Sequence, residues 1–131
     1  MRRISHRRTG AVVVEMAIAL PLVVFVLLGS FEVAKANFMR HAARAAAYEG
    51  ARAGILPGTD ASKIQGAVDF VLHTMGVRHG DVVITPNNFN TSTQRVRVEV
   101  TIHADRDLFF TPYFFRNATF HGSCELSREV W

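Results

Sequence analysis

The side chains that most often bind metals or transfer protons are few in this sequence and widely spread. Its histidines and its single cysteine, Cys124, have no zinc-ligand spacing, and an HExxH motif is absent. The sequence also lacks a glycine-rich phosphate loop, a nucleophile elbow and a CxxC pair. We therefore expect no catalytic residue, no metal site, no cofactor and no small-molecule substrate, so that the protein is not an enzyme. The six histidines are His6, His41, His73, His79, His103 and His121.

An anchored enzyme is the least favoured interpretation, and it depends on three residues. Loss of an activity on mutation of His103, His121 or Asp105 would revive it. Asp105 and Asp107 flank Arg106, and alternating acids of this kind belong more often to a solvated turn than to a cation site. Cys124 has no second cysteine to pair with in the chain, and we expect it to be a small buried residue on a strand.

Glu15 is a charged residue within an apolar segment, and its presence there requires a chemical explanation. It is the one charged residue in the apolar run of residues 11–31. A carboxylate in hydrocarbon costs roughly 2.5–3.5 kcal/mol on insertion scales, and ionisable groups inside a membrane usually face a partner. We expect such a partner to explain Glu15, since snorkelling at the membrane edge would give it no role.

The net charge of +4 is carried by a short N-terminal leader. When the four arginines of residues 1–10 are removed from the 15 basic residues, 11 remain, against 11 acidic residues. A basic leader before an apolar helix directs the N-terminus to the cytoplasm, whereas a nucleic-acid-binding protein has a basic face. We expect contact with membrane lipid and no nucleic-acid partner. The four residues are Arg2, Arg3, Arg7 and Arg8.

The apolar run of residues 11–31 has three interpretations. It is long enough to cross the hydrocarbon layer of about 30 Å as a helix, which fits a plain transmembrane anchor. As a secretory signal peptide it would be cut after Ala34-Lys35-Ala36, before Asn37, although Glu15 interrupts its core. The third interpretation places a cut between Gly10 and Ala11, which makes Glu15 the fifth residue of the processed chain.

The third interpretation is supported by a resemblance over residues 7–58. A basic leader, a small residue at the cut, a glutamate five positions later and an apolar helix resemble the class III signal of type IV pilin-like proteins. The segment is similar to the TadE-like minor pseudopilins of tight-adherence (Tad/Flp) pili. It departs from the family at Tyr48, where an arginine is expected. The resemblance is carried by Gly10, Ala11, Glu15, Ala19-Leu20-Pro21, Phe31-Glu32 and residues 46–52.

The resemblance implies a non-catalytic protein of the bacterial inner membrane that takes part in pilus assembly. A prepilin peptidase would cut between Gly10 and Ala11, and Glu15 would serve in peptidase recognition and in assembly. The implied partners are the peptidase, other pilins or pseudopilins and the assembly machinery. The alternative function is a single-pass membrane-anchored or secreted extracytoplasmic binding domain unrelated to pili.

The helical pattern predicts an α+β protein with three parts: a cytoplasmic leader (1–10), a transmembrane helix (11–31) and an extracytoplasmic domain (32–131). Pro21 predicts a kink near residues 17–21, because it removes a backbone hydrogen bond and clashes with the preceding turn. The helix continues outward through an alanine-rich row that permits close packing, and Gly54 with Pro57-Gly58 ends it. An amphipathic helix over residues 60–75 follows, capped by Asp60 or Thr59.

Alternation of apolar and polar residues then predicts a small antiparallel sheet of about three strands. Val96, Val98, Val100 and Ile102 form the buried face of the clearest strand. Residues 81–85 and 118–128 supply the other two strands, the latter with Phe120, Cys124 and Leu126 on one face. The aromatic stretch 105–117 is expected to fold back on the body, or else to dock on another subunit or the membrane.

Overall fold

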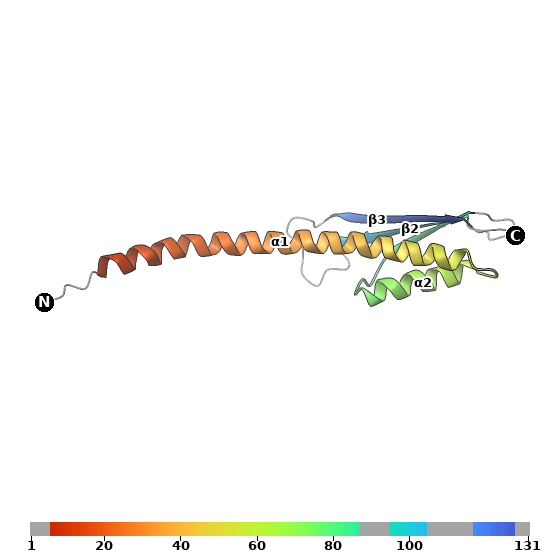
Figure 1. Ribbon diagram of the computed structural model, residues 1–131, viewed down its shortest axis with the longest axis horizontal. Coiled ribbons are helices and arrows are strands. Elements are labelled where there is room, and N and C mark those ends of the chain that lie inside the picture. Colours follow the sequence, from red (N-terminus) through yellow and green to blue (C-terminus); the bar gives the residue numbers. More distant parts are fainter. Residues whose placement is uncertain (1–5, 87–94, 105–116, 128–131) are drawn as a thin grey trace. The chain divides into compact units, whose positions relative to one another are not determined.

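The computed structural model describes residues 6–86, 95–104 and 117–127, without the side chains of residues 6–9. The chain divides into two compact units between Ala34 and Lys35. Helix α1, His6–Gly54, contributes to both units, and the second unit also contains α2, Ala61–Thr74 (Figure 1). The remaining elements are the strands β1, Asp81–Thr85, β2, Arg95–His103, and β3, Thr119–Ser127. This order confirms the predicted α+β fold.

In the first unit, α1 exposes its apolar side chains. Exposed fractions along it run from 44% at Val24 to 72% at Ile18. The Ser30 hydroxyl donates a hydrogen bond to the Val26 carbonyl (2.8 Å), so this polar group is satisfied within the helix. Among the residues described, α1 is the one helix long and apolar enough to span a membrane.

The second unit has a three-stranded antiparallel sheet in the order β1-β2-β3. The buried face of β2 is the one predicted, because Val96, Val98, Val100 and Ile102 are at most 1% exposed. The register places residues of the three strands in rows, with Val82 beside Val100 and Val100 beside Gly122. On β3, Phe120, Cys124 and Leu126 share one face, as predicted, but only Phe120 is buried. Cys124 is partly buried, less than predicted, and packs against the core.

Both helices cover the buried face of this sheet (Figure 1). The alanine-rich row of α1 forms the contact, with Ala42, Ala43, Ala46 and Ala47 fully buried. Small residues are needed because the backbones are close. A side-chain carbon built on Gly50 would lie 2.6 Å from Val68 of α2, and one built on Gly122 would overlap the backbone of Ala43 and Arg44.

Helix α2 has the apolar stripe predicted from the sequence, and the structure shows which of the two predicted residues caps its N-terminus. The Lys63 backbone N–H donates to the Asp60 carboxylate (3.1 Å), whereas the Thr59 hydroxyl donates to the Ala53 carbonyl (2.9 Å). Asp60 is therefore the N-cap. Ile64, Val68 and Leu72 are its buried stripe, and Gly76 follows the helix with a φ of 75°.

Three parts of the sequence prediction lie outside the described residues. They are the leader residues 1–5, the connection 87–94 between β1 and β2, and residues 105–116, which include most of the aromatic stretch. The predictions made for them stay predictions.

Replacement of Gly122 should test the contact between α1 and β3. Gly122→Ala places a methyl group against the α1 backbone, and overpacking of this kind costs about 1–3 kcal/mol. Gly66→Ala is the matched control, because nothing lies within 4 Å of the new carbon. It should stabilise α2 by about 0.5–1 kcal/mol. Denaturant unfolding of the full chain in detergent measures both, and equal effects of the two variants would contradict the described packing.

The Asp60 cap should make stability depend on pH. Hydrogen bonds from the Lys63 N–H and the Ser62 hydroxyl lower the pKa of the Asp60 carboxyl. Because the folded-state pKa is lowered, the stabilisation is present above the unfolded pKa and is lost as pH falls through the folded one, below about pH 4. Asp60→Ala should lower the melting temperature at pH 7 and have less effect in acid. Asp60→Asn, which retains an oxygen acceptor, should lose less at pH 7, and an equal loss in both variants would show that the hydrogen bond to the Lys63 N–H is not what stabilises α2.

Candidate functional site

Gly10 and Ala11, the predicted processing site, lie inside α1. Nothing lies within 4 Å of a side-chain carbon built on Gly10, so packing does not require glycine at this position. Glycine inside a helix is about 1 kcal/mol less favourable than alanine. Gly10 therefore weakens α1 locally, and no packing contact among the described residues requires glycine there.

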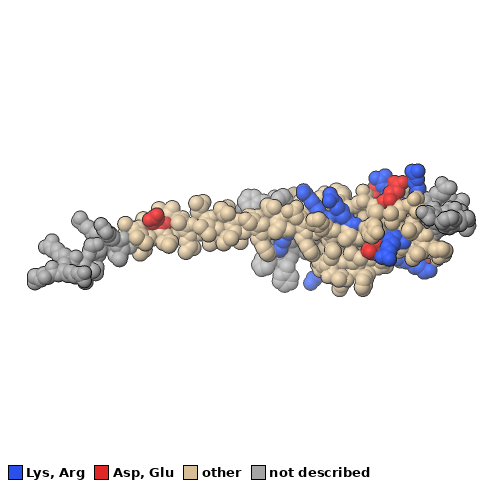
Figure 2. All heavy atoms as spheres, viewed as in Figure 1, with Lys and Arg blue, Asp and Glu red and all other residues tan. Residues whose placement is uncertain are grey.

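Glu15 lies on the same helix, four residues after Ala11, at an axial distance of about 6 Å. Its side chain is exposed and has no hydrogen bond or ion pair among the described residues. The surrounding stretch of α1 is tan in Figure 2 apart from this acidic group. The structure thus brings Gly10, Ala11 and Glu15 together within two turns of one helix, and among the side chains that it describes the Glu15 carboxylate has no partner.

Pro21 is the fourth residue predicted to matter in this segment. It lies within α1, and the helix continues on both sides of it. Six residues separate it from Glu15, so it does not contact the processing site along the helix. The kink expected near residues 17–21 stays a prediction.

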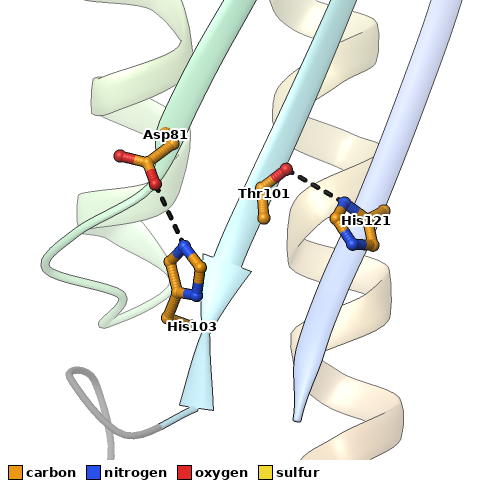
Figure 3. Close-up of polar contacts among 4 residues, drawn as sticks. All are labelled: Asp81, Thr101, His103 and His121. Carbon is orange, nitrogen blue, oxygen red and sulfur yellow. Dashed lines mark hydrogen bonds and ion pairs between the residues drawn. The ribbon is translucent and has the colours of Figure 1, made fainter. Parts of the chain in front are cut away.

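The outer face of the sheet holds the closest polar contacts between strands (Figure 3). His103 Nε2 of β2 and Asp81 Oδ2 of β1 are 3.0 Å apart. Thr101 Oγ1 of β2 shares a hydrogen bond of 3.0 Å with His121 Nδ1 of β3. Two ion pairs extend this face, Arg97 with Glu99 (3.1 Å) and Arg95 with Glu125 (3.6 Å).

The two histidine contacts join strands and do not form a chain of nucleophile, base and acid. The Thr101 hydroxyl bonds to His121, whereas the carboxylate of Asp81 bonds to His103, so the two pairs are separate (Figure 3). The Asp81 side chain is 67% exposed, so it has no desolvated environment that would tune its chemistry. Among the described residues, no three histidine, cysteine, aspartate or glutamate side chains are placed to hold a metal ion.

Sequence reasoning named His103 and His121 singly and predicted neither pair. Alternation along β2 assigns Thr101 and His103 to the outer face, but the partner of each depends on the strand register. The register pairs Asp81 with Thr101 and Thr101 with His121, which places the four residues on one face. Asp105, the third residue named with them, lies outside the described residues.

Comparison with known protein families gives a match on the first helix. Residues 10–52 match the family described as TadE-like protein. The match begins at Gly10, contains Ala11, Glu15 and Pro21, and ends two residues before the end of α1. No curated protein and no solved structure matches the chain.

Proposed function

We propose that this chain, which belongs to the TadE-like family by its residues 10–52, is a minor pseudopilin that helps to assemble a tight-adherence pilus. The family is associated with assembly of this pilus and is generally non-catalytic. The observation that carries the proposal is the coincidence of this match with an exposed apolar stretch of α1, residues 11–31, whose single acidic residue, Glu15, has no partner among the described residues.

The first step of the proposed mechanism is insertion and processing. Residues 11–31 cross the bacterial inner membrane once, with the basic leader 1–10 in the cytoplasm and residues 32–131 on the far side. A prepilin peptidase then cuts between Gly10 and Ala11. The exposure of α1 in this segment supports contact with lipid, because apolar side chains there have no protein partner among the described residues.

The second step is assembly, and it gives Glu15 its role. The cut creates an α-amino group on Ala11, about one turn from Glu15. When two processed helices pack side by side, the amino group of one subunit pairs with Glu15 of the next. The pair removes the cost of an isolated charge in hydrocarbon, about 2.5–3.5 kcal/mol, and it fixes the register of the helices. The partners are therefore other pilins or pseudopilins of the same pilus.

Processing is tested by determining the N-terminal residue of the membrane-extracted protein from its native host by mass spectrometry. We expect Ala11. Gly10→Val should leave the full-length chain in the membrane at the normal level, because no neighbour contacts this position and the cut requires a small residue. Gly29→Val is the matched control, since it also has nothing within 4 Å, and it should be cut normally. A wild-type chain that starts at Met1 would indicate a plain anchor, and one that starts at Asn37 a secreted domain.

The role of Glu15 is tested by Glu15→Gln, which keeps the shape of the side chain and removes its charge. Membrane insertion should be unchanged or slightly better, because a neutral amide costs less in hydrocarbon. Pilus formation, counted by electron microscopy of cells, should fall severalfold, since a charge pair of about 1 kcal/mol or more is lost from each packed helix. Glu99→Gln removes the same charge from the sheet and should leave pili unchanged. Normal piliation of the Glu15 variant would refute the assembly role.

A further inference from the structure

The sheet of the second unit has two edge strands that pair with β2 on one side only, β1 and β3. Among the described residues, neither has a backbone partner on its other side. An unpaired edge presents a row of N–H and C=O groups that can pair with another strand, and proteins usually protect such edges.

Among its own residues, the longer edge strand, β3, has one charged side chain, Glu125, and few of the other usual protections. Its nine residues contain no lysine and no proline, and the register with β2 runs without a bulge from Thr119 to Ser127. The edge strand β1 is short, five residues, and Pro86 follows it directly. A long and regular edge with one charged residue favours pairing with a further strand at β3 more than the short β1 does.

The flank of α1 beneath β3 carries positive charge. The guanidinium of Arg40 lies 6.0 Å from the ring centre of Phe120 on β3. Arg44 follows one helical turn later, beside Gly122, and both arginines are exposed. Figure 2 shows basic side chains along this part of α1. Within the described chain, neither Arg40 nor Arg44 has a carboxylate partner.

The opposite flank of the unit carries an unpaired acid. On α2, Val68 faces Gly50 of α1, and Leu72 faces Gly80 at the start of β1. Asp69 lies one turn from Leu72 on the side away from α1, where it is exposed. No hydrogen bond or ion pair of the Asp69 side chain occurs among the described residues. Asp69 therefore places a negative charge on the flank of β1, whereas Arg40 and Arg44 place positive charges on the flank of β3.

The two charged flanks lie at neighbouring levels of the sheet. Arg44 lies beside Gly122, which pairs with Val100 of β2. Asp69 is next to Val68 in the sequence, and Val68 contacts α1 at Gly50, a position that lies beside Val98 of β2. The rows of Val98 and Val100 are two residues apart, about 6.6 Å along a strand, a distance that an arginine side chain can span.

We propose that copies of this chain join edge to edge, with β3 of one copy beside β1 of a second copy and Arg44 facing Asp69 of that copy. Both strands run antiparallel to β2, so the new pair is parallel and all copies share one strand direction. The joint uses different surfaces on the two copies, and each copy keeps one edge free. Such heterologous contacts build rings or open filaments rather than closed dimers.

Symmetric joints are disfavoured by the same charges. Antiparallel pairing of β3 with β3 around Ser123 would place Arg44 close to Arg44 of the second copy, because Gly122 is next to the centre of that pairing. Pairing of β1 with β1 would bring the Asp69 flanks together. Like charges placed opposite each other cost several kcal/mol at an interface, so they select the mixed joint.

The joint is tested by cysteine cross-linking of the full chain in native-host membranes. Val83 and Ser123 are exposed on the outer face and share a row through Glu99. In a Cys124→Ser background, Val83→Cys with Ser123→Cys should give a ladder of dimers, trimers and larger species on oxidation or with a short bismaleimide. Neighbouring strands are about 4.8 Å apart, within the Cα distance of about 4.4–6.8 Å that a disulfide requires.

Each single-cysteine variant should give no ladder. Dimers from Ser123→Cys alone would show the symmetric β3 joint, and a double variant without a ladder would show that copies do not meet at these edges. Bands with a different protein would assign β3 to another partner. Each of these three results overturns the proposal.

Charge reversal adds a test that folding defects cannot imitate. Arg44→Asp or Asp69→Arg should lower the cross-linked fraction about tenfold, and the two changes together should restore it. Arg52→Asp, an exposed change on the same helix, should have no effect. Failure of the double reversal to restore the ladder would overturn the assignment of these two residues. Processing at Gly10 is measured separately, so a missing ladder with a normal Ala11 start leaves the proposed function intact.

Discussion

The close contact between the small residues of α1 and the sheet is the constraint on which the second unit depends. Ala43 and Ala47 are fully buried, and Gly122 brings the β3 backbone against the helix at a distance that no side chain would permit. Gly50 and Gly54 likewise let Val68 and Val96 pack directly against the α1 backbone. A side-chain carbon built on either glycine would have a neighbour closer than 3 Å. The core is thin because the face of α1 that packs in it consists mostly of alanine and glycine. Most of its apolar volume comes from the valines of β2 and the stripe of α2.

Much of this arrangement could be predicted from the sequence, and the reasons are local. Alternation over residues 95–103 assigns the two faces of β2 without knowledge of its neighbours, and Asp60 before an apolar stripe identifies the start of α2. The less regular pattern of β3 has its cause in Gly122. Where an apolar residue would complete the alternation, the helix backbone takes its space.

Other features depend on tertiary structure that no local pattern contains. Alanines occupy both the buried and the half-exposed sides of α1, as Ala43 and Ala45 show, so composition does not identify the packed face. The contacts of His103 with Asp81 and of Thr101 with His121 follow from strand register, which joins residues about 20 positions apart. The role of Glu15 stays a prediction, and it could be made from the sequence alone because a carboxylate in an apolar run has the same consequence in any fold.

The position of α1 also has a mechanical consequence. Within the second unit its residues from Ala36 to Ala51 lie along the sheet, in the same sense as β3, since Arg40 is beside Phe120 and Ala43 beside Gly122. A pull on the chain at Lys35, along the helix, loads all of these contacts in shear at once and does not open them one by one. A domain attached in this way resists unfolding by tension on its N-terminal side better than a domain attached through a flexible linker.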